Sequence, residues 1–292
     1  MSERKVLVCG AGLMGHGIAQ VMAAAGHRVW LYEPEAARAE AGRERIAGNL
    51  ERAVAKGKIS DEDRTAQLGR VSVAASLAEA ASQAELVVEA IFEDEAVKQS
   101  LFAEIDAAAP PSSVLASNTS SISITRLAAA TGAGRRARFV GMHFFSPVPV
   151  MPLIELIRGA ETDDATEAYV RDVAAELGKQ VIVSKDRPGF IVNRILMPYL
   201  GESMRAFEEG LGTAEDIDSG AKVGLNHPMG PLELADFIGL DVCLHIMEVL
   251  QDGFGAAHMA PPPILRQLVA AGHLGQKTGR GFYTYPREPK KG

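Results

Sequence analysis

The stretch Val6-Leu7-Val8-Cys9-Gly10-Ala11-Gly12-Leu13-Met14-Gly15 decides the fold, because an apolar run leads directly into a glycine-rich turn. The run predicts a buried strand, and residues 12–25 are typical of a helix. In a G-x-G-x-x-G turn the first glycine permits the tight turn, the second lets a pyrophosphate approach the backbone, and the third lets helix and strand pack closely. The free N–H groups at the helix N-terminus suit phosphates. We therefore expect a dinucleotide to contact Gly10, Gly12, Leu13, Met14 and Gly15.

Strand-like and helical stretches alternate over the first half of the chain. Beyond the first unit, strands are expected at residues 29–32, 71–73, 86–89, 114–116 and 139–142, and a long helix over 35–56. Such alternation predicts an α/β fold with a Rossmann-type, doubly wound parallel sheet covered by helices on both faces.

The pattern changes near residues 185–189, beyond which helix formers dominate. Helices are expected at about 191–209, 214–223, 231–250 and 262–271. We therefore predict a Rossmann-like nucleotide-binding domain over residues 1–186, followed by a smaller all-α C-terminal domain over residues 187–292.

The bulk composition excludes several function classes. The chain has 292 residues and a net charge of −7, which offers no basic surplus for nucleic acid or a membrane surface. No apolar run approaches the roughly 20 residues that span a bilayer, and no targeting segment is recognisable. Only two cysteines occur, Cys9 and Cys243, which form no metal-ligand pattern. We expect no metal and a cytoplasmic location.

Glu33 ends the second predicted strand and discriminates between cofactors. A carboxylate there accepts hydrogen bonds from a ribose 2′-hydroxyl and repels a 2′-phosphate. Residues 34–37 supply no cation. The sequence therefore predicts NAD rather than NADP.

A set of further motifs resembles the 3-hydroxyacyl-CoA dehydrogenase family, in the family's order and over nearly the whole chain. The segments are residues 10–19 (GAGLMGHGIA), 87–93 (VVEAIFE), 97–98 (VK), 117–121 (SNTSS), 143–148 (HFFSPV), 188–194 (PGFIVNR), 227–231 (HPMGP) and 277–283 (KTGRGFY). Together they are far more specific than the glycine turn alone. The resemblance implies an NAD-dependent dehydrogenase.

Alcohol oxidation by NAD needs a base for the hydroxyl proton, and a histidine suits that role at neutral pH. The resemblance assigns the base to His143 and its carboxylate partner to Glu155, twelve residues on. If the intervening prolines turn the chain back, the carboxylate could reach the imidazole and stabilise its protonated form. Beside two phenylalanines, a purely structural histidine is the alternative.

The resemblance places Ser120 and Asn193 against the substrate, and Ser120 also against the cofactor. The Ser120 hydroxyl could instead cap the helix that follows. Asn193 lies in an apolar helical stretch, where an amide needs a partner and a structural one would also serve. Four further cofactor positions follow from the resemblance: Ala90, Glu93, Lys98 and Lys277. Glu93 and Lys98 could equally be solvated surface charges.

Coenzyme A carries a phosphorylated ADP, so cations should lie along its path. Residues 35–58 contain six cations against four acids, although a solvated helix face would look similar. Asn49 and Lys56 match the family's CoA-contacting positions, with Asn49 standing where a serine is common. Ser146 stands where most relatives have asparagine, so the substrate contact there has a shorter side chain.

The sequence thus leads us to expect reversible oxidation of an (S)-3-hydroxyacyl-CoA, of short chain such as 3-hydroxybutyryl-CoA, to the 3-oxoacyl-CoA. A second interpretation keeps the scaffold but takes a hydroxyacyl group on a carrier protein, or a free sugar acid. A third is a non-enzymatic nucleotide-binding protein, against which the presence of His143, Glu155, Ser120 and Asn193 argues. The resemblance favours a homodimer, with the C-terminal domain contributing to the substrate site and to dimerisation.

Overall fold

The computed structural model describes residues 3–286 of the chain. The chain divides into two compact units that meet in sequence between Arg187 and Pro188. Within the described residues, no helix combines the length and the apolar character needed to cross a membrane.

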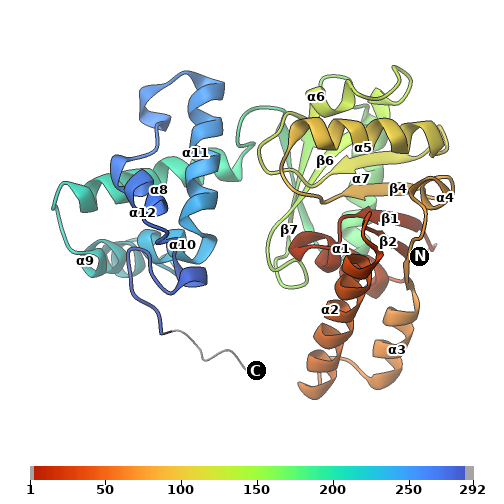
Figure 1. The fold of residues 1–292 in the computed structure, drawn as a ribbon, viewed down its shortest axis with the longest axis horizontal. Coiled ribbons are helices and arrows are strands. Elements are labelled where there is room, and N and C mark those ends of the chain that lie inside the picture. The colour runs from red at the N-terminus through yellow and green to blue at the C-terminus, as the bar shows by residue number, and fades with distance from the viewer. Residues whose placement is uncertain (1–2, 287–292) are drawn as a thin grey trace. The chain divides into compact units, whose positions relative to one another are not determined.

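The first unit is built on one eight-stranded sheet with helices on both faces (Figure 1). Its strands are β1 (Lys5–Cys9), β2 (Arg28–Tyr32), β3 (Val71–Val73), β4 (Leu86–Glu89), β5 (Val114–Ser117), β6 (Phe139–Phe144), β7 (Leu153–Arg158) and β8 (Gln180–Lys185). Its helices are α1 (Leu13–Ala24), α2 (Ala36–Ala55), α3 (Asp61–Gly69), α4 (Leu77–Ala81), α5 (Glu95–Ala108), α6 (Ile124–Ala128), the 3₁₀ turn η1 (Arg136–Arg138) and α7 (Asp164–Glu176).

The strand order is β3-β2-β1-β4-β5-β6-β7-β8, and the first six strands are parallel. This confirms the Rossmann-type doubly wound sheet. The two strands β7 and β8 lie outside the prediction: β7 pairs antiparallel with β6, and β8 runs parallel to β7. The sheet is therefore mixed, with an antiparallel edge added to a parallel core.

The interior strands β1, β4 and β5 are buried runs of mainly apolar residues, as coverage of the sheet on both faces requires. On one face, Val6 and Val8 pack with Ile18 and Met22 of α1. The carboxyl ends of β1, β2, β4, β5 and β6 meet at one edge of the sheet, because these strands are parallel. The order reverses direction between β1 and β4, which is where open α/β sheets bind ligands.

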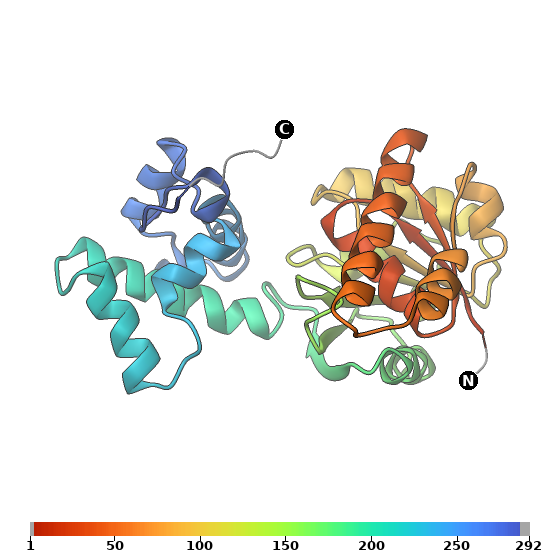
Figure 2. The ribbon, with the colours of Figure 1, turned by 90° about the horizontal axis from the view of Figure 1, so that it is seen from below.

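The second unit contains helices as its regular elements (Figure 2). They are α8 (Val192–Glu208), α9 (Ala214–Ser219), the π-helical turn η2 (Gly220–Gly224), α10 (Pro231–Ile238), α11 (Leu240–Phe254), the 3₁₀ turn η3 (Ala257–Met259), α12 (Pro263–Ala270) and the 3₁₀ turn η4 (Gln276–Thr278). The single helix expected over 231–250 is two helices, because Gly239 adopts a φ of 104° that ends α10 and begins α11.

Candidate active site

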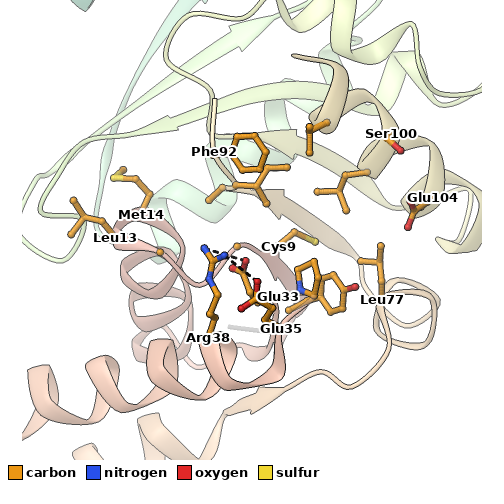
Figure 3. A pocket seen from close by; sticks show the side chains of 18 residues that line it. Cys9, Leu13, Met14, Glu33, Glu35, Arg38, Leu77, Phe92, Ser100 and Glu104 are labelled. Atoms are coloured by element: carbon orange, nitrogen blue, oxygen red, sulfur yellow. Dashed lines mark ion pairs between the residues drawn. The ribbon is translucent and has the colours of Figure 1, made fainter. Parts of the chain in front are cut away.

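A crevice of about 580 Å³ lies at the carboxyl ends of β1, β2 and β4 (Figure 3). Figure 3 shows Leu13 and Met14 at the start of α1, with Phe92 on one side of the crevice and Arg38 on the other. Other lining residues include Gly10, Gly12, Tyr32, Glu33, Leu77, Ala90, Val97 and Leu101. The predicted glycine turn and the predicted acid Glu33 therefore border one cavity.

The glycine turn has the geometry that a pyrophosphate needs. Gly10 has a φ of 103°, and a Cβ there would lie 2.4 Å from the Ala90 carbonyl oxygen. A Cβ on Gly15 would lie 1.8 Å from the Gly10 carbonyl oxygen, so only glycine allows α1 to pack this closely. A Cβ on Gly12 would meet nothing within 4 Å, so its backbone borders open space. Within the described residues α1 also begins without a side-chain cap, which leaves its N-terminus suited to an anion.

Glu33 follows β2 and bridges to the glycine turn. Its Oε2 accepts a hydrogen bond of 2.8 Å from the Ala11 N–H, and its side chain is only 12% exposed. Its Oε1 lies 3.6 Å from Nη2 of Arg38. Residues 34–37 hold no cation, but Arg38 follows directly and lines the crevice.

His143 and Glu155 contact each other across the β6–β7 pair. They are direct register partners, and His143 Nδ1 lies 3.1 Å from Glu155 Oε2. Both are buried, with Glu155 fully inaccessible. The chain turns back between β6 and β7, so the condition under which the Glu155 carboxylate reaches the imidazole is met. His143 itself lies inside β6 rather than after it, because that strand runs on to Phe144.

The end of β6 is tied to the end of β5. Asn118 Oδ1 accepts a hydrogen bond of 2.8 Å from the Phe144 N–H. Asn118 opens the SNTSS loop that carries Ser120, so this bond joins that loop to the strand that carries His143. The Phe145 ring packs 4.6 Å from the imidazole, measured between ring centroids.

Glu93 organises the same loop from the β4–α5 connection. Its Oε1 accepts hydrogen bonds from the Thr119 hydroxyl at 2.5 Å, the Ser120 N–H at 2.9 Å and the Ser121 hydroxyl at 3.0 Å. Burial alone would raise the pKa of Glu93, but Lys98 and these hydrogen bonds outweigh it and hold that pKa below its ordinary value. The carboxylate is therefore ionised while it holds the loop.

Lys98 is a buried cation with carboxylate partners, which excludes the solvated alternative. Its side chain is 1% exposed, and its Nζ contacts Glu89 and lies 3.2 Å from Glu93 Oε2. Lys98 therefore affects the site through its contacts with Glu89 and Glu93, because almost none of its own side chain is exposed.

Glu89 is a residue that sequence reasoning missed. It ends β4, is fully buried, and accepts hydrogen bonds from the Ser117 hydroxyl at 2.6 Å and the Ile91 N–H at 2.8 Å. Burial raises the pKa of Glu89, an effect that Lys98 opposes. The available signal was an acid at the end of a buried strand, the same feature that identified Glu33.

The two residues predicted for the CoA path, Asn49 and Lys56, lie in and directly after α2. Asn49 lines a second cavity of about 520 Å³ together with His16, Arg45 and Arg52. Its amide donates to Gln20 at 2.9 Å and accepts from Arg52 at 2.5 Å. Lys56 is exposed directly after α2.

Ser146 is exposed in the connection between β6 and β7, three residues from His143. Two predicted residues belong to the helical unit. Asn193 is buried in the first turn of α8, and Lys277 lies 2.7 Å from a carboxylate oxygen of Asp241. Their assignment to the site stays a prediction.

Both cysteines are free and buried. Burial raises the pKa of the Cys243 thiol to about 12 and that of the Cys9 thiol likewise upward. Among residues 3–286, no group of three or more His, Cys, Asp or Glu side chains is arranged to hold a metal ion.

Comparisons with known proteins agree over nearly the whole chain. The model of the NAD-binding domain of 3-hydroxyacyl-CoA dehydrogenase matches residues 5–187, and the model of that family's C-terminal domain matches residues 189–285. A 3-hydroxybutyryl-CoA dehydrogenase of Bradyrhizobium diazoefficiens is 51% identical over 97% of this chain and 95% of its own. One of Mycobacterium tuberculosis is 49% identical over 97% and 98%.

A solved structure gives the same result. The (S)-3-hydroxybutyryl-CoA dehydrogenase PaaH1 from Ralstonia eutropha superposes with a TM-score of 0.94 at 45% identity, covering 98% of this chain and all of the other. Together with the glycine turn, Glu33 and the His143–Glu155 contact, these matches establish that the chain belongs to the 3-hydroxyacyl-CoA dehydrogenase family.

Proposed function

We propose that this chain is an NAD-dependent enzyme that reversibly oxidises (S)-3-hydroxyacyl-CoA, of short chain such as 3-hydroxybutyryl-CoA, to the 3-oxoacyl-CoA. The observation that carries the proposal is the buried His143–Glu155 pair at the sheet edge where the glycine turn lies. The names of the curated relatives support the substrate class.

Gly10, Gly12, Leu13, Met14 and Gly15 would hold the pyrophosphate of NAD, Glu33 the adenosine ribose, and Ala90 would border the cofactor. When bound, NAD supplies the hydride acceptor. His143 takes the proton from the substrate hydroxyl, and Glu155 fixes the imidazole tautomer through Nδ1 and stabilises the imidazolium. In the reverse direction the imidazolium returns that proton to the new alkoxide.

Ser120 and Asn193 would stabilise the charge that develops on the substrate oxygen. Glu93 and Lys98 would act by positioning: Glu93 holds the Ser120 backbone, and Lys98 holds Glu93. Ser146 would contact the substrate with its hydroxyl, and Lys277 would approach the cofactor from the helical unit.

Asn49 and Lys56 would contact the coenzyme A moiety. The cavity beside Asn49 supports this, because Arg45 and Arg52 lining it supply cations for phosphates. A carrier-linked hydroxyacyl group or a free sugar acid would not need this path.

We further propose that the helical unit, residues 187–292, contributes to the substrate site and mediates a homodimer. Its exposed apolar side chains support the second role: Leu211, Val223, Leu225 and Phe237 are each more than half exposed. A cytoplasmic location completes the proposal, supported by the two free thiols.

A substrate panel tests the proposal. NADH consumption should be fastest with acetoacetyl-CoA, and at least about 100-fold slower in kcat/KM with free acetoacetate, because the remote CoA contacts then contribute nothing to catalysis. A carrier-protein-linked acetoacetyl group is the third arm. Equal or better turnover of the carrier-linked compound would overturn the CoA assignment.

A further inference from the structure

Arg38 lies at the mouth of the nucleotide crevice and is only loosely held there (Figure 3). It belongs to the first turn of α2. Its Nη2 lies 3.6 Å from Glu33 Oε1 and its Nη1 lies 3.7 Å from Glu35 Oε1. Both separations exceed a good hydrogen bond, and the Arg38 side chain is 63% exposed. Exposed pairs of this kind are weak, so the guanidinium can change partners at little cost.

Glu33 is the fixed member of the pair. Its other oxygen accepts the 2.8 Å hydrogen bond from the Ala11 N–H in the glycine turn, and its side chain is 12% exposed. A nucleotide whose pyrophosphate rests on that turn must place its adenosine ribose near Glu33. The position beside the ribose 2′-oxygen is therefore shared by one anchored carboxylate and one movable guanidinium.

We propose that Arg38 is a latent site for a ribose 2′-phosphate, masked by Glu33 and Glu35. The chain then rejects NADP because Glu33 repels the phosphate, not because a cation is lacking. Neutralising Glu33 removes the repulsion and releases Arg38, whose planar fork of N–H donors matches a phosphate. The inference rests on the cofactor class and on no property of the acyl substrate.

The variant Glu33→Gln is matched to this question. The glutamine carbonyl can still accept from the Ala11 N–H, so the glycine turn keeps its support, while the charge is removed. Two double variants divide the effect: E33Q/R38Q removes the latent ligand, and E33Q/R64Q removes an arginine of α3 whose partner is Asp61, outside the crevice.

Calorimetry with adenosine 2′,5′-bisphosphate and with ADP measures the affinity for each ligand directly, without turnover. In E33Q the affinity for the bisphosphate relative to ADP should rise about 100-fold, since like-charge juxtaposition is removed. E33Q/R38Q should lose at least about tenfold of that gain, and E33Q/R64Q should keep it. The ratio of kcat/KM for NADPH and NADH with acetoacetyl-CoA should follow the same order.

Two results would overturn the inference: no gain in E33Q, or a full gain in E33Q/R38Q. Should E33Q fail to bind ADP, Glu35→Gln gives the second measurement, because it releases Arg38 from one carboxylate without touching the glycine turn. E35Q should raise relative bisphosphate affinity a few-fold in the presence of Arg38, and no rise would equally reject the masking. If the protein were inactive on acyl-CoA but E33Q still gained affinity for the bisphosphate, the proposed substrate would be rejected and the role of Arg38 would stand.

Discussion

Several side chains in the first unit gain their chemistry from burial beside an ionisable partner. His143 Nδ1 lies 3.1 Å from Glu155 Oε2, and both residues are buried. Burial strengthens such a contact, because the electrostatic attraction between the two groups is greater in a medium of low dielectric constant. The Lys98 ammonium is buried in the same way against Glu89 and Glu93.

Removing either member of the His143–Glu155 pair should lower kcat while nucleotide binding persists. We expect His143→Asn to reduce kcat by roughly 10³-fold and Glu155→Gln by roughly 10²-fold, within the range for general acid–base catalysis. Steady-state assays and NADH fluorescence titration measure the two properties. Glu161, which forms a surface ion pair with Arg136, provides the control, because E161Q should leave kcat unchanged. Near-normal turnover of H143N would reject the base assignment.

Lys98→Met should destabilise the fold, because it leaves the Glu89 carboxylate buried without its cation. Breaking a buried pair from one side typically costs about 3–5 kcal/mol. Urea unfolding followed by tryptophan fluorescence at Trp30 measures the loss. The double variant E89Q/K98M should recover a large part of it, since no charge is then stranded. A double variant as unstable as K98M would show that packing of the lysine stem, not charge, dominates.

Among the elements, the β6–β7 connection has its own internal brace. Lys179, between α7 and β8, donates from Nζ to the Val148 and Met151 carbonyl oxygens, both at 2.7 Å. Burial lowers the pKa of this amine. The brace fixes the loop that separates His143 from Glu155.

Lys179→Met should therefore loosen this loop. Two carbonyl groups lose their partner, which should cost roughly 1–3 kcal/mol of unfolding free energy. A several-fold fall in kcat should accompany it, because the loop also carries Ser146. Lys179→Arg retains a donor, so its unfolding free energy and its kcat should lie between those of the parent and those of K179M. A fully active K179M would show that this loop does not affect catalysis.

The sequence predicts the parallel half of the sheet well, because β1, β2, β4 and β5 are short apolar runs separated by helical spacing. It misses β7 and β8, since Glu155 and the terminal charges of these strands interrupt the apolar pattern, and antiparallel pairing depends on a distant partner. It also misses Glu89, whose role depends on a buried ion pair with Lys98, nine residues away. The local spacing of residues does not show that both side chains are buried.

At the scale of the first unit, one cluster joins its beginning to its end. Arg4 precedes β1 and donates to both carboxylate oxygens of Glu176 in α7, at 2.8 and 2.9 Å. His27, with 1% of its side chain exposed, places Nε2 3.2 Å from the same carboxylate. Residues more than 140 positions apart are thus held together.

Acid should weaken the stabilisation that the cluster of Arg4, His27 and Glu176 provides. Burial lowers the pKa of His27, although Glu176 opposes the effect. The unfolded chain therefore takes up this proton at a higher pH than the folded chain does. The contribution is complete above the ordinary histidine pKa of about 6.5 and is lost as the pH falls below it. Urea midpoints between pH 7.5 and 5 should decline less steeply in His27→Gln than in the parent; an identical slope would contradict the argument.

The antiparallel pairing of β6 with β7 has a consequence for how this chemistry can be altered. Because His143 and Glu155 oppose each other in the ladder, their side chains leave the same face, and a shift of one position in either strand would send one of them to the opposite face. An insertion or deletion within residues 145–152 is therefore tolerable only if the pairing frame survives. Both residues also lie on one continuous segment, residues 139–158. This segment could therefore be grafted into another sheet as a single peptide that carries the histidine and its carboxylate partner.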